Sequence, residues 1–241
     1  MIKFFRHIRK KLISENHMGK YFKYAIGEIL LVVIGILIAL SINNWNENRK
    51  LQNSETKLLT DLLDELEFSY KEISEAMRNN TSLLNQYKTI SRAIENDVAY
   101  NQDSLGDAFS VLPFWSSPYL PKTSFESIKN RDLNLIRDDS LRKKIIHLYE
   151  YSFPMVIEDY NRMEWNFSQS ITLPVLLKNI NRDVETGEAM PIDFEALKTN
   201  QEYTSYLNQL IGLRQGGIFQ CERALNDITS LIEQISIQLS K

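Results

Sequence analysis

The sequence predicts an all-α protein, in which an N-terminal transmembrane helix is followed by an elongated antiparallel helical bundle with long first and last helices. Three observations lead to this prediction. One apolar run lies near the N-terminus, and two long stretches of the remaining chain repeat apolar residues at steps of three and four. In addition, the 241 residues include only 8 Gly and 6 Pro, which is few for an all-β protein with its many turns.

The apolar run, residues 25–42, predicts the membrane-spanning helix. Its uninterrupted part, residues 29–42, would be about 21 Å long as a helix, which is shorter than a hydrocarbon core of about 30 Å. Adding residues 25–28 lengthens the helix to about 27 Å, so a spanning helix takes Glu28 at least to the membrane boundary. Aromatic residues flank the run, as they do at membrane interfaces: Tyr21, Phe22 and Tyr24 precede it and Trp45 follows it.

The uneven distribution of charge predicts the orientation of this helix. The first 25 residues hold seven Lys and Arg against one Glu, for a net charge of +6, whereas the remainder holds 21 against 30, for −9. Because basic flanks stay in the cytoplasm, we expect a basic cytoplasmic leader at residues 1–24, a transmembrane helix at 25–45 and an exported helical domain at 46–241. A basic start on an acidic body also argues against a nucleic-acid partner.

A cleaved signal peptide is the alternative interpretation of the same run. Ala39-Leu40-Ser41 has the small residues of a cleavage site. The basic leader is long for the start of a signal peptide, however, which favours an uncleaved anchor.

Four stretches near the N-terminus carry a resemblance to a known family: residues 1–6 (MIKFFR), 19–29 (GKYFKYAIGEI), 32–40 (VVIGILIAL) and 43–47 (NNWNE). They resemble the opening of a family of uncharacterised single-pass membrane proteins of Bacteroidota-type Gram-negative bacteria. The resemblance is dense over residues 1–50 and looser beyond them. It implies a bacterial inner-membrane anchor with a periplasmic domain. It implies no activity and no site residues, because that family is a domain of unknown function.

Three residues of the apolar run are candidates for contact with a partner inside the membrane. A carboxylate in a bilayer is costly and often marks function, which makes Glu28 a candidate for a polar contact. The alternative is an interfacial Glu28 that is protonated or reaches the headgroups beside Lys20 and Lys23. Gly35 and Ala39, four positions apart, would let another helix approach closely.

Two long stretches predict the main helices of the bundle. Core positions of the first follow a three-four alternation: Leu59, Leu62, Leu66, Ser69, Ile73, Ala76, Asn80, Leu83, Tyr87, Ile90 and Ile94. Those of the last are Leu207, Ile211, Arg214, Ile218, Cys221, Leu225, Ile228, Ile232, Ile235 and Leu239. As helices, residues 44–96 and 201–240 would span about 80 Å and about 60 Å. Because each stripe needs a partner, we expect the two helices to pair antiparallel.

The middle of the chain predicts shorter elements. Residues 96–121 are rich in turn-forming residues and predict turns and a loop. Capping residues predict the starts of four helical segments: Thr123, Asp138, Asp193 and Asn200. We expect Pro154 and Pro174 to kink or end helices, and residues 182–190 to form a polar loop.

The exported part carries no catalytic or metal-binding motif that we recognise, so we expect no cofactor and no metal site. His147 is the only His after residue 17, and Cys221 falls in the last heptad series, where a buried, inert thiol is expected. Asp61, Asp64 and Glu65 have the spacing to share a helix face and hold a cation, although a solvated outer face is the simpler interpretation.

Phe114, Trp115 and Tyr119 make the predicted loop unusually apolar. If the two long helices form a stalk, these residues lie near its distal end and are candidates for contact with a partner. The alternative is that they cover the end of the bundle core.

Together these observations predict a non-enzymatic periplasmic helical protein anchored in the bacterial inner membrane, which acts as an adaptor or interaction module of an envelope complex. Its expected contacts are the lipid bilayer and a protein partner or a second copy of itself. Two alternatives remain open: a homo-oligomeric structural spacer, and an envelope enzyme with a site around His147.

Overall fold

The structure is a computed structural model that describes residues 18–131 and 133–240. The chain divides into two compact units, the first ending at Glu55 and the second running from Thr56 to Lys241. Helix α2, Met18–Glu95, contributes residues to both units. Most of the predicted basic leader, residues 1–17, lies outside the described residues.

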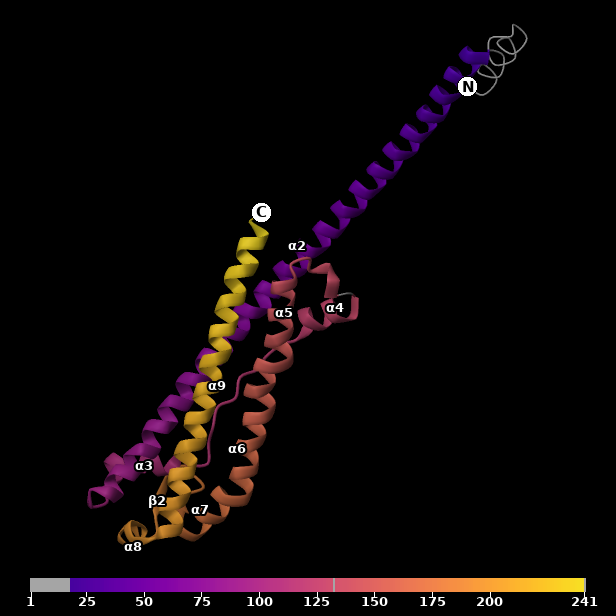
Figure 1. The fold of residues 1–241 in the computed structure, drawn as a ribbon. Helices are drawn as coiled ribbons and strands as arrows, with labels where there is room; N and C mark the ends of the chain where they lie inside the picture. Colours follow the sequence, from indigo (N-terminus) through magenta and orange to yellow (C-terminus); the bar gives the residue numbers. More distant parts are fainter. Residues whose placement is uncertain (1–17, 132, 241) are drawn as a thin grey trace. The chain divides into compact units, whose positions relative to one another are not determined.

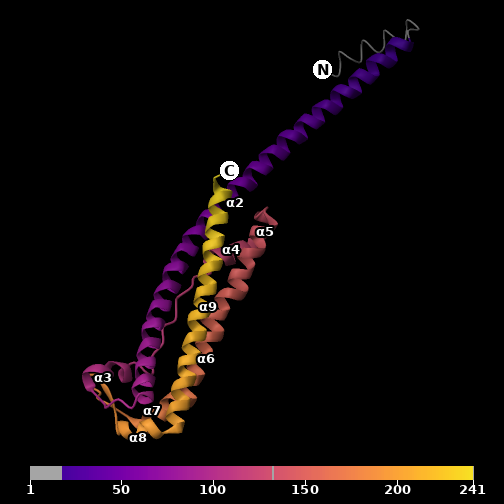
Figure 2. The same cartoon turned by 60° about the vertical axis from the view of Figure 1, so that its left-hand side comes forward.

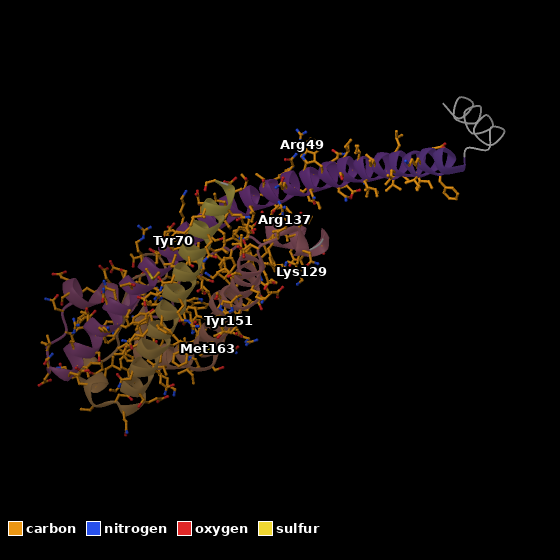
Figure 3. The ribbon with its side chains drawn as sticks, turned by 45° about the horizontal axis from the view of Figure 1, so that its top comes forward. Arg49, Tyr70, Lys129, Arg137, Tyr151 and Met163 are labelled. Atoms are coloured by element: carbon orange, nitrogen blue, oxygen red, sulfur yellow. The ribbon has the colours of Figure 1, made fainter. Side chains whose placement is uncertain are left out.

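In the first unit, α2 carries the apolar run as a regular helix. Mean hydropathy reaches 2.7 over a window of 18 residues, and none of that window is buried within the structure. By length and composition, this helix could cross a membrane, in agreement with the predicted span. Beyond the apolar run, the guanidinium of Arg49 (labelled in Figure 3) lies 5.8 Å from the centre of the Trp45 ring, a cation–π contact.

In the second unit, three long helical elements lie side by side (Figures 1 and 2): α2 from Thr56 onward, a middle helix at residues 139–179, and α9, Gln201–Leu239. The middle helix runs without a break through α5 Asp139–His147, η2 Leu148–Ser152, η3 Met155–Tyr160, α6 Asn161–Phe167, η4 Ser168–Thr172 and α7 Leu173–Asn179. The shorter elements are α3 Gln102–Ser110, α4 Thr123–Arg131, the 3₁₀ turn η1 Leu133–Leu135, α8 Phe194–Thr199, and the strands β1 Ile180–Arg182 and β2 Ala189–Pro191.

Two apolar clusters form the core of the bundle, one toward each end. The first contains Leu62 of α2 and Ile235 near the end of α9. The second contains Ile90 of α2 and Leu207 near the start of α9. The two helices therefore run antiparallel, and the predicted all-α fold is confirmed.

Polar side chains define several helix starts. Asp138, Asp193 and Asn200 each accept a hydrogen bond from the amide three residues later, at 3.0, 3.0 and 3.1 Å, and cap α5, α8 and α9 as predicted. Thr123 begins α4, also as predicted. The prediction of turns and a loop over residues 96–121 is wrong for α3, which Asn101 caps.

The buried face of the middle helix repeats every four residues. Seven buried residues follow one another at this spacing: Leu148, Ser152, Val156, Tyr160, Glu164, Ser168 and Thr172. In a regular α-helix of 3.6 residues per turn, six such steps would rotate the face by about 240° and turn it away from the core. The π-helical segments η2, η3 and η4 close their hydrogen bonds one residue later, which unwinds the helix and keeps this face on the core.

Of the two outcomes predicted for Pro154 and Pro174, a kink or an end of the helix, the end is wrong, because the middle helix continues through both residues. Each lies near a π-helical segment: Pro154 falls between η2 and η3, and Pro174 comes two residues after the end of η4. A widened turn has room for a residue that lacks the backbone amide, which removes the usual conflict with the preceding turn.

Residues 182–190 are not simply a polar loop. Strands β1 and β2 pair antiparallel, with Ile180 opposite Pro191 and Arg182 opposite Ala189. Gly187 in the connecting turn has a φ of 75°, a conformation that favours glycine. Each strand has only three residues, which is too short for an alternation of apolar and polar residues to be recognised in the sequence.

An extended segment, residues 113–122, connects α3 to α4 and is called the strap. It runs back along α2 toward the end of the bundle where α9 finishes (Figures 1 and 2). Four α2 side chains bind the strap and the start of α4 in reverse order: Tyr87 at Phe114, Asn80 at Ser116, Glu72 at Tyr119 and Glu65 at Ser124. The 22 residues from Glu65 to Tyr87 span about 33 Å as helix, and the ten from Phe114 to Ser124 span about 33 Å when extended.

Candidate functional site

A buried arginine connects four segments of the bundle. The Arg214 side chain is 1% exposed and forms an ion pair with Glu164, at 3.0 Å from Nη1 to Oε1. Nη1 also donates to Asn80 Oδ1 at 3.0 Å and to the Tyr160 hydroxyl at 2.9 Å. Nη2 donates to the Phe114 carbonyl at 2.9 Å. One guanidinium on α9 therefore binds α2, the strap and the middle helix, and we call this group the Arg214 cluster.

Two tyrosines complete the Arg214 cluster. The Tyr87 hydroxyl donates to the Phe114 carbonyl at 2.8 Å and accepts a bond from Arg214 Nη2 at 3.3 Å. The Tyr160 hydroxyl donates to Glu164. Burial raises the pKa of both tyrosines above the usual value, although the Arg214 charge opposes this, so both hydroxyls stay protonated and able to donate.

Burial also raises the pKa of the Glu164 carboxyl, against the opposing effects of Arg214 and of the bond from Tyr160. A buried ion pair offers little net stability, because both ions leave water, but it fixes which groups can lie together. With its members enclosed between helices and the strap, the cluster is suited to holding segments in one arrangement.

A second buried carboxylate joins α2 to the strap end. Glu65 accepts hydrogen bonds from the Tyr149 hydroxyl at 2.7 Å and from the Ser124 amide at the start of α4 at 2.8 Å. The interpretation of Asp61, Asp64 and Glu65 as a solvated face is therefore wrong for Glu65, while Asp61 and Asp64 are exposed. Glu65 is a structural acceptor for two groups that burial would otherwise leave unpaired.

The three aromatic residues predicted as a distal contact lie on the strap and point to different neighbours. Phe114 is 53% exposed beneath the Arg182 guanidinium, 5.7 Å from its ring centre. The Trp115 indole N–H donates to Asn161 at 2.7 Å, and its ring meets Trp165 edge to face. Tyr119 is 70% exposed and packs edge-on against Phe68 of α2. The expected position at the distal end is wrong for most of this segment, because the strap runs along the bundle.

The middle helix also carries exposed apolar residues that the sequence reasoning missed. Met163 and Trp165 are both more than half exposed, and Figure 3 labels Met163 on this helix. Met163 lines a groove toward α9 together with six other uncharged residues: Asn166, Phe167, Ser170, Gln209, Gly212 and Leu213. Exposed apolar residues scattered on helices give no sequence signal, because core and surface apolar positions look alike in a chain read alone.

In the first unit, Glu28, Gly35 and Ala39 share one face of α2. Seven residues return a helix to within about 20° of its starting direction, and four more add about 40°. Gly35 and Ala39 are exposed, and apart from the neighbouring backbone of α2 nothing lies within 4 Å of where a Gly35 Cβ would be. The residues predicted as an intramembrane contact therefore lie on one face of α2, on which Gly35 and Ala39 are accessible.

The remaining candidates lie apart from these features. His147 is exposed on the middle helix and stacks on Tyr151, with ring centres 5.0 Å apart. Cys221 is buried in the core, where desolvation raises the pKa of its thiol to about 11. Among the described residues, no group of three or more His, Cys, Asp or Glu is placed to hold a metal ion.

Comparisons with known proteins give one family match. A model described as "Family of unknown function (DUF6090)" matches residues 28–169, a range that includes Glu28, the strap and Glu164 but not Arg214. No curated protein and no solved structure matches the chain. The family match covers more than half of the sequence and agrees with the resemblance to a domain of unknown function. The chain therefore belongs to the DUF6090 family of unknown function.

Proposed function

We propose that this chain is a non-enzymatic, single-pass membrane protein whose helical bundle is an interaction module of an envelope complex. The observation that carries the proposal is the apolar helix of residues 25–42. No part of its most apolar window of 18 residues is buried within the structure. Lipid is the environment that such a surface favours over water. Trp45 after the run and the basic residues before it support this environment.

The proposed location is the bacterial inner membrane, with the N-terminus in the cytoplasm and the bundle in the periplasm. The net charge of +6 over the first 25 residues supports this orientation. Residues 1–50 resemble uncharacterised single-pass proteins of Bacteroidota, and the inner-membrane anchor that this resemblance implies supports the compartment.

Membrane anchoring is tested by fractionation of cells that make the full chain. We expect the protein to stay in the membrane pellet after alkaline carbonate extraction, to begin at Met1 by intact mass, and to lose its bundle when protease is added to spheroplasts. A control variant, Leu31→Asp with Ile36→Asp, should move to the soluble fraction. Release of the wild type into the soluble fraction by carbonate would contradict the anchor. So would an intact mass that corresponds to a chain cleaved after Ser41.

Two accessible surfaces support an interaction role. The face of α2 that carries Glu28, Gly35 and Ala39 supports a helix partner inside the bilayer, because the small residues Gly35 and Ala39 allow close approach. In the bundle, Phe114 and Tyr119 on the strap and Trp165 beside it are exposed aromatic residues, a type enriched at protein interfaces.

A second candidate is self-assembly, in which the partner is another copy of this chain. The same face of α2 favours it, since one face with small residues can pack against its own copy. Two differently tagged copies expressed together would distinguish the candidates: co-purification of both tags supports self-assembly, and recovery of a single tag with another protein supports a hetero-complex.

A further inference from the structure

The strap is held by side chains instead of by a neighbouring backbone. Between residues 115 and 121, the described backbone hydrogen bonds all end on α2 side chains. Asn80 makes two of them, donating to the Ser116 carbonyl at 2.8 Å and accepting from the Ser116 amide at 2.9 Å. Glu72 accepts the third, from the Tyr119 amide at 3.2 Å. A segment tied in this way can detach without unwinding any helix.

The strap alternates between buried and exposed side chains. Leu112, directly before it, is 1% exposed and Leu120 is 6% exposed, whereas their neighbours Phe114 and Tyr119 are mostly exposed. Pro113, Pro118 and Pro121 fix φ and carry no amide, so the strap stays extended and needs few hydrogen bond acceptors.

What the strap covers makes its opening less costly. The Phe114 carbonyl lies on Arg214 Nη2, and Asn80 accepts from Arg214 while it binds Ser116. Opening breaks these bonds, but it also admits water to an ion pair whose burial is unfavourable. The hydration of Arg214 and Glu164 offsets part of the lost bonding, which an apolar core at the same place would not do.

We propose that the strap is a cover, which opens and closes over the Arg214 cluster while the three long helices stay folded. Asn80 and Arg214 are the closing contacts, and Pro113 and Pro121 lie near the two ends of the strap. In the open state, the bundle presents an arginine–carboxylate pair with two tyrosines to the solvent and frees Trp115 from Asn161. The proposal depends on the second unit alone and stands whether or not the chain spans a membrane.

Amide hydrogen exchange tests the proposal. The exchange rates are measured on the full chain in detergent micelles at several urea concentrations, all below those that unfold the protein. The Ser116 and Tyr119 amides should exchange with little dependence on urea, because local opening exposes little surface, whereas the Ile228 and Leu231 amides of α9 should show the steep dependence of global unfolding. Asn80→Ala should speed strap exchange about tenfold, from the loss of two hydrogen bonds. The control Asn85→Ala, at an exposed site on the same helix, should leave strap exchange unchanged.

A reversible lock provides the second arm. Asn79 Nδ2 lies 3.5 Å from Ser116 Oγ, so a disulfide in the Asn79→Cys, Ser116→Cys variant should close the strap. Oxidation should slow Ser116 and Tyr119 exchange until reductant is added. The proposal is overturned if strap amides exchange with the same free energy and urea dependence as α9, or if the disulfide fails to form in the folded protein.

Discussion

The backbone of Gly217 lies directly against the ring of Tyr160. A Cβ at Gly217 would come within 2.1 Å of Tyr160 Cζ and 2.5 Å of its hydroxyl oxygen. The same hydroxyl accepts a hydrogen bond from Arg214 at 2.9 Å. A glycine of α9 therefore lets the middle helix approach closely enough to join the Arg214 cluster, and the packing of the two helices and the polar contacts depend on each other.

Gly217→Ala should destabilise the bundle by about 2 kcal/mol, because the added methyl group displaces the Tyr160 ring from a close-packed contact. Gly216→Ala is the matched control on the same helix, since nothing lies within 4 Å of its Cβ position. It should stabilise the protein by about 1 kcal/mol through helix propensity. Urea unfolding of both variants checks the prediction, and equal effects of the two would contradict the contact.

Arg214→Met should lower the free energy of unfolding by about 3 kcal/mol or more, because Glu164 would be left as a buried charge without its partner. Arg223→Met, at an exposed site of the same helix, should change stability by less than about 0.5 kcal/mol. Replacing both charges, Arg214→Met with Glu164→Leu, should restore part of the loss. If the loss of stability in the double variant equals the sum of the losses in Arg214→Met and Glu164→Leu, the ion pair is not the cause of the Arg214→Met destabilisation.

The Glu164 carboxyl should make stability depend on pH in a direction opposite to most carboxylates. Burial raises its folded-state pKa above the usual value of 4.5, so the folded state binds the proton more tightly than the unfolded state. This contribution to stability is fully present below pH 4.5 and is lost as pH rises through the raised pKa. The free energy of unfolding is measured for wild type and Glu164→Gln at several pH values. The wild-type value minus the Glu164→Gln value should increase as the pH is lowered. A difference independent of pH would contradict this assignment.

Glu65→Ala should cost about 2 kcal/mol, because the Tyr149 hydroxyl and the Ser124 amide each lose an acceptor. Asp64→Ala is the neighbouring control and should change stability by less than about 0.5 kcal/mol, since its side chain is exposed. Thermal unfolding of the two variants distinguishes a buried acceptor from a solvated acidic face, which predicts equally small effects.

The long helices could be predicted from the sequence because their periodicity is a local property. The three-four series on α2 and α9 identified buried positions such as Leu62 and Ile235, and capping residues located helix starts. The start of the middle helix at Asp138 was predicted in the same way, but its continuity was not, since its buried residues repeat every four positions. Such a repeat does not match a regular α-helix, and it becomes meaningful only once the π-helical segments are known.

The Arg214 cluster left a signal that the sequence reasoning did not use. Ser69 and Asn80 interrupt the series on α2 and Arg214 interrupts the series on α9, and antiparallel pairing brings Asn80 and Arg214 together at 3.0 Å. Two interruptions at matching depth predict a polar contact between the helices. The contribution of Glu164 and of the strap carbonyl could not be predicted, because their positions depend on the path of the chain between the two long helices.

The central claim, that the chain is an anchored interaction module, is tested most directly by a tagged purification from gently solubilised membranes. Wild type should recover one near-stoichiometric partner, and Glu28→Leu should lose or weaken it. Gly27→Leu is the control, because it adds an apolar side chain at the adjacent position on another face of the helix, and it should retain the partner. Recovery of no partner by the wild type, or equal recovery by all three, would contradict the account.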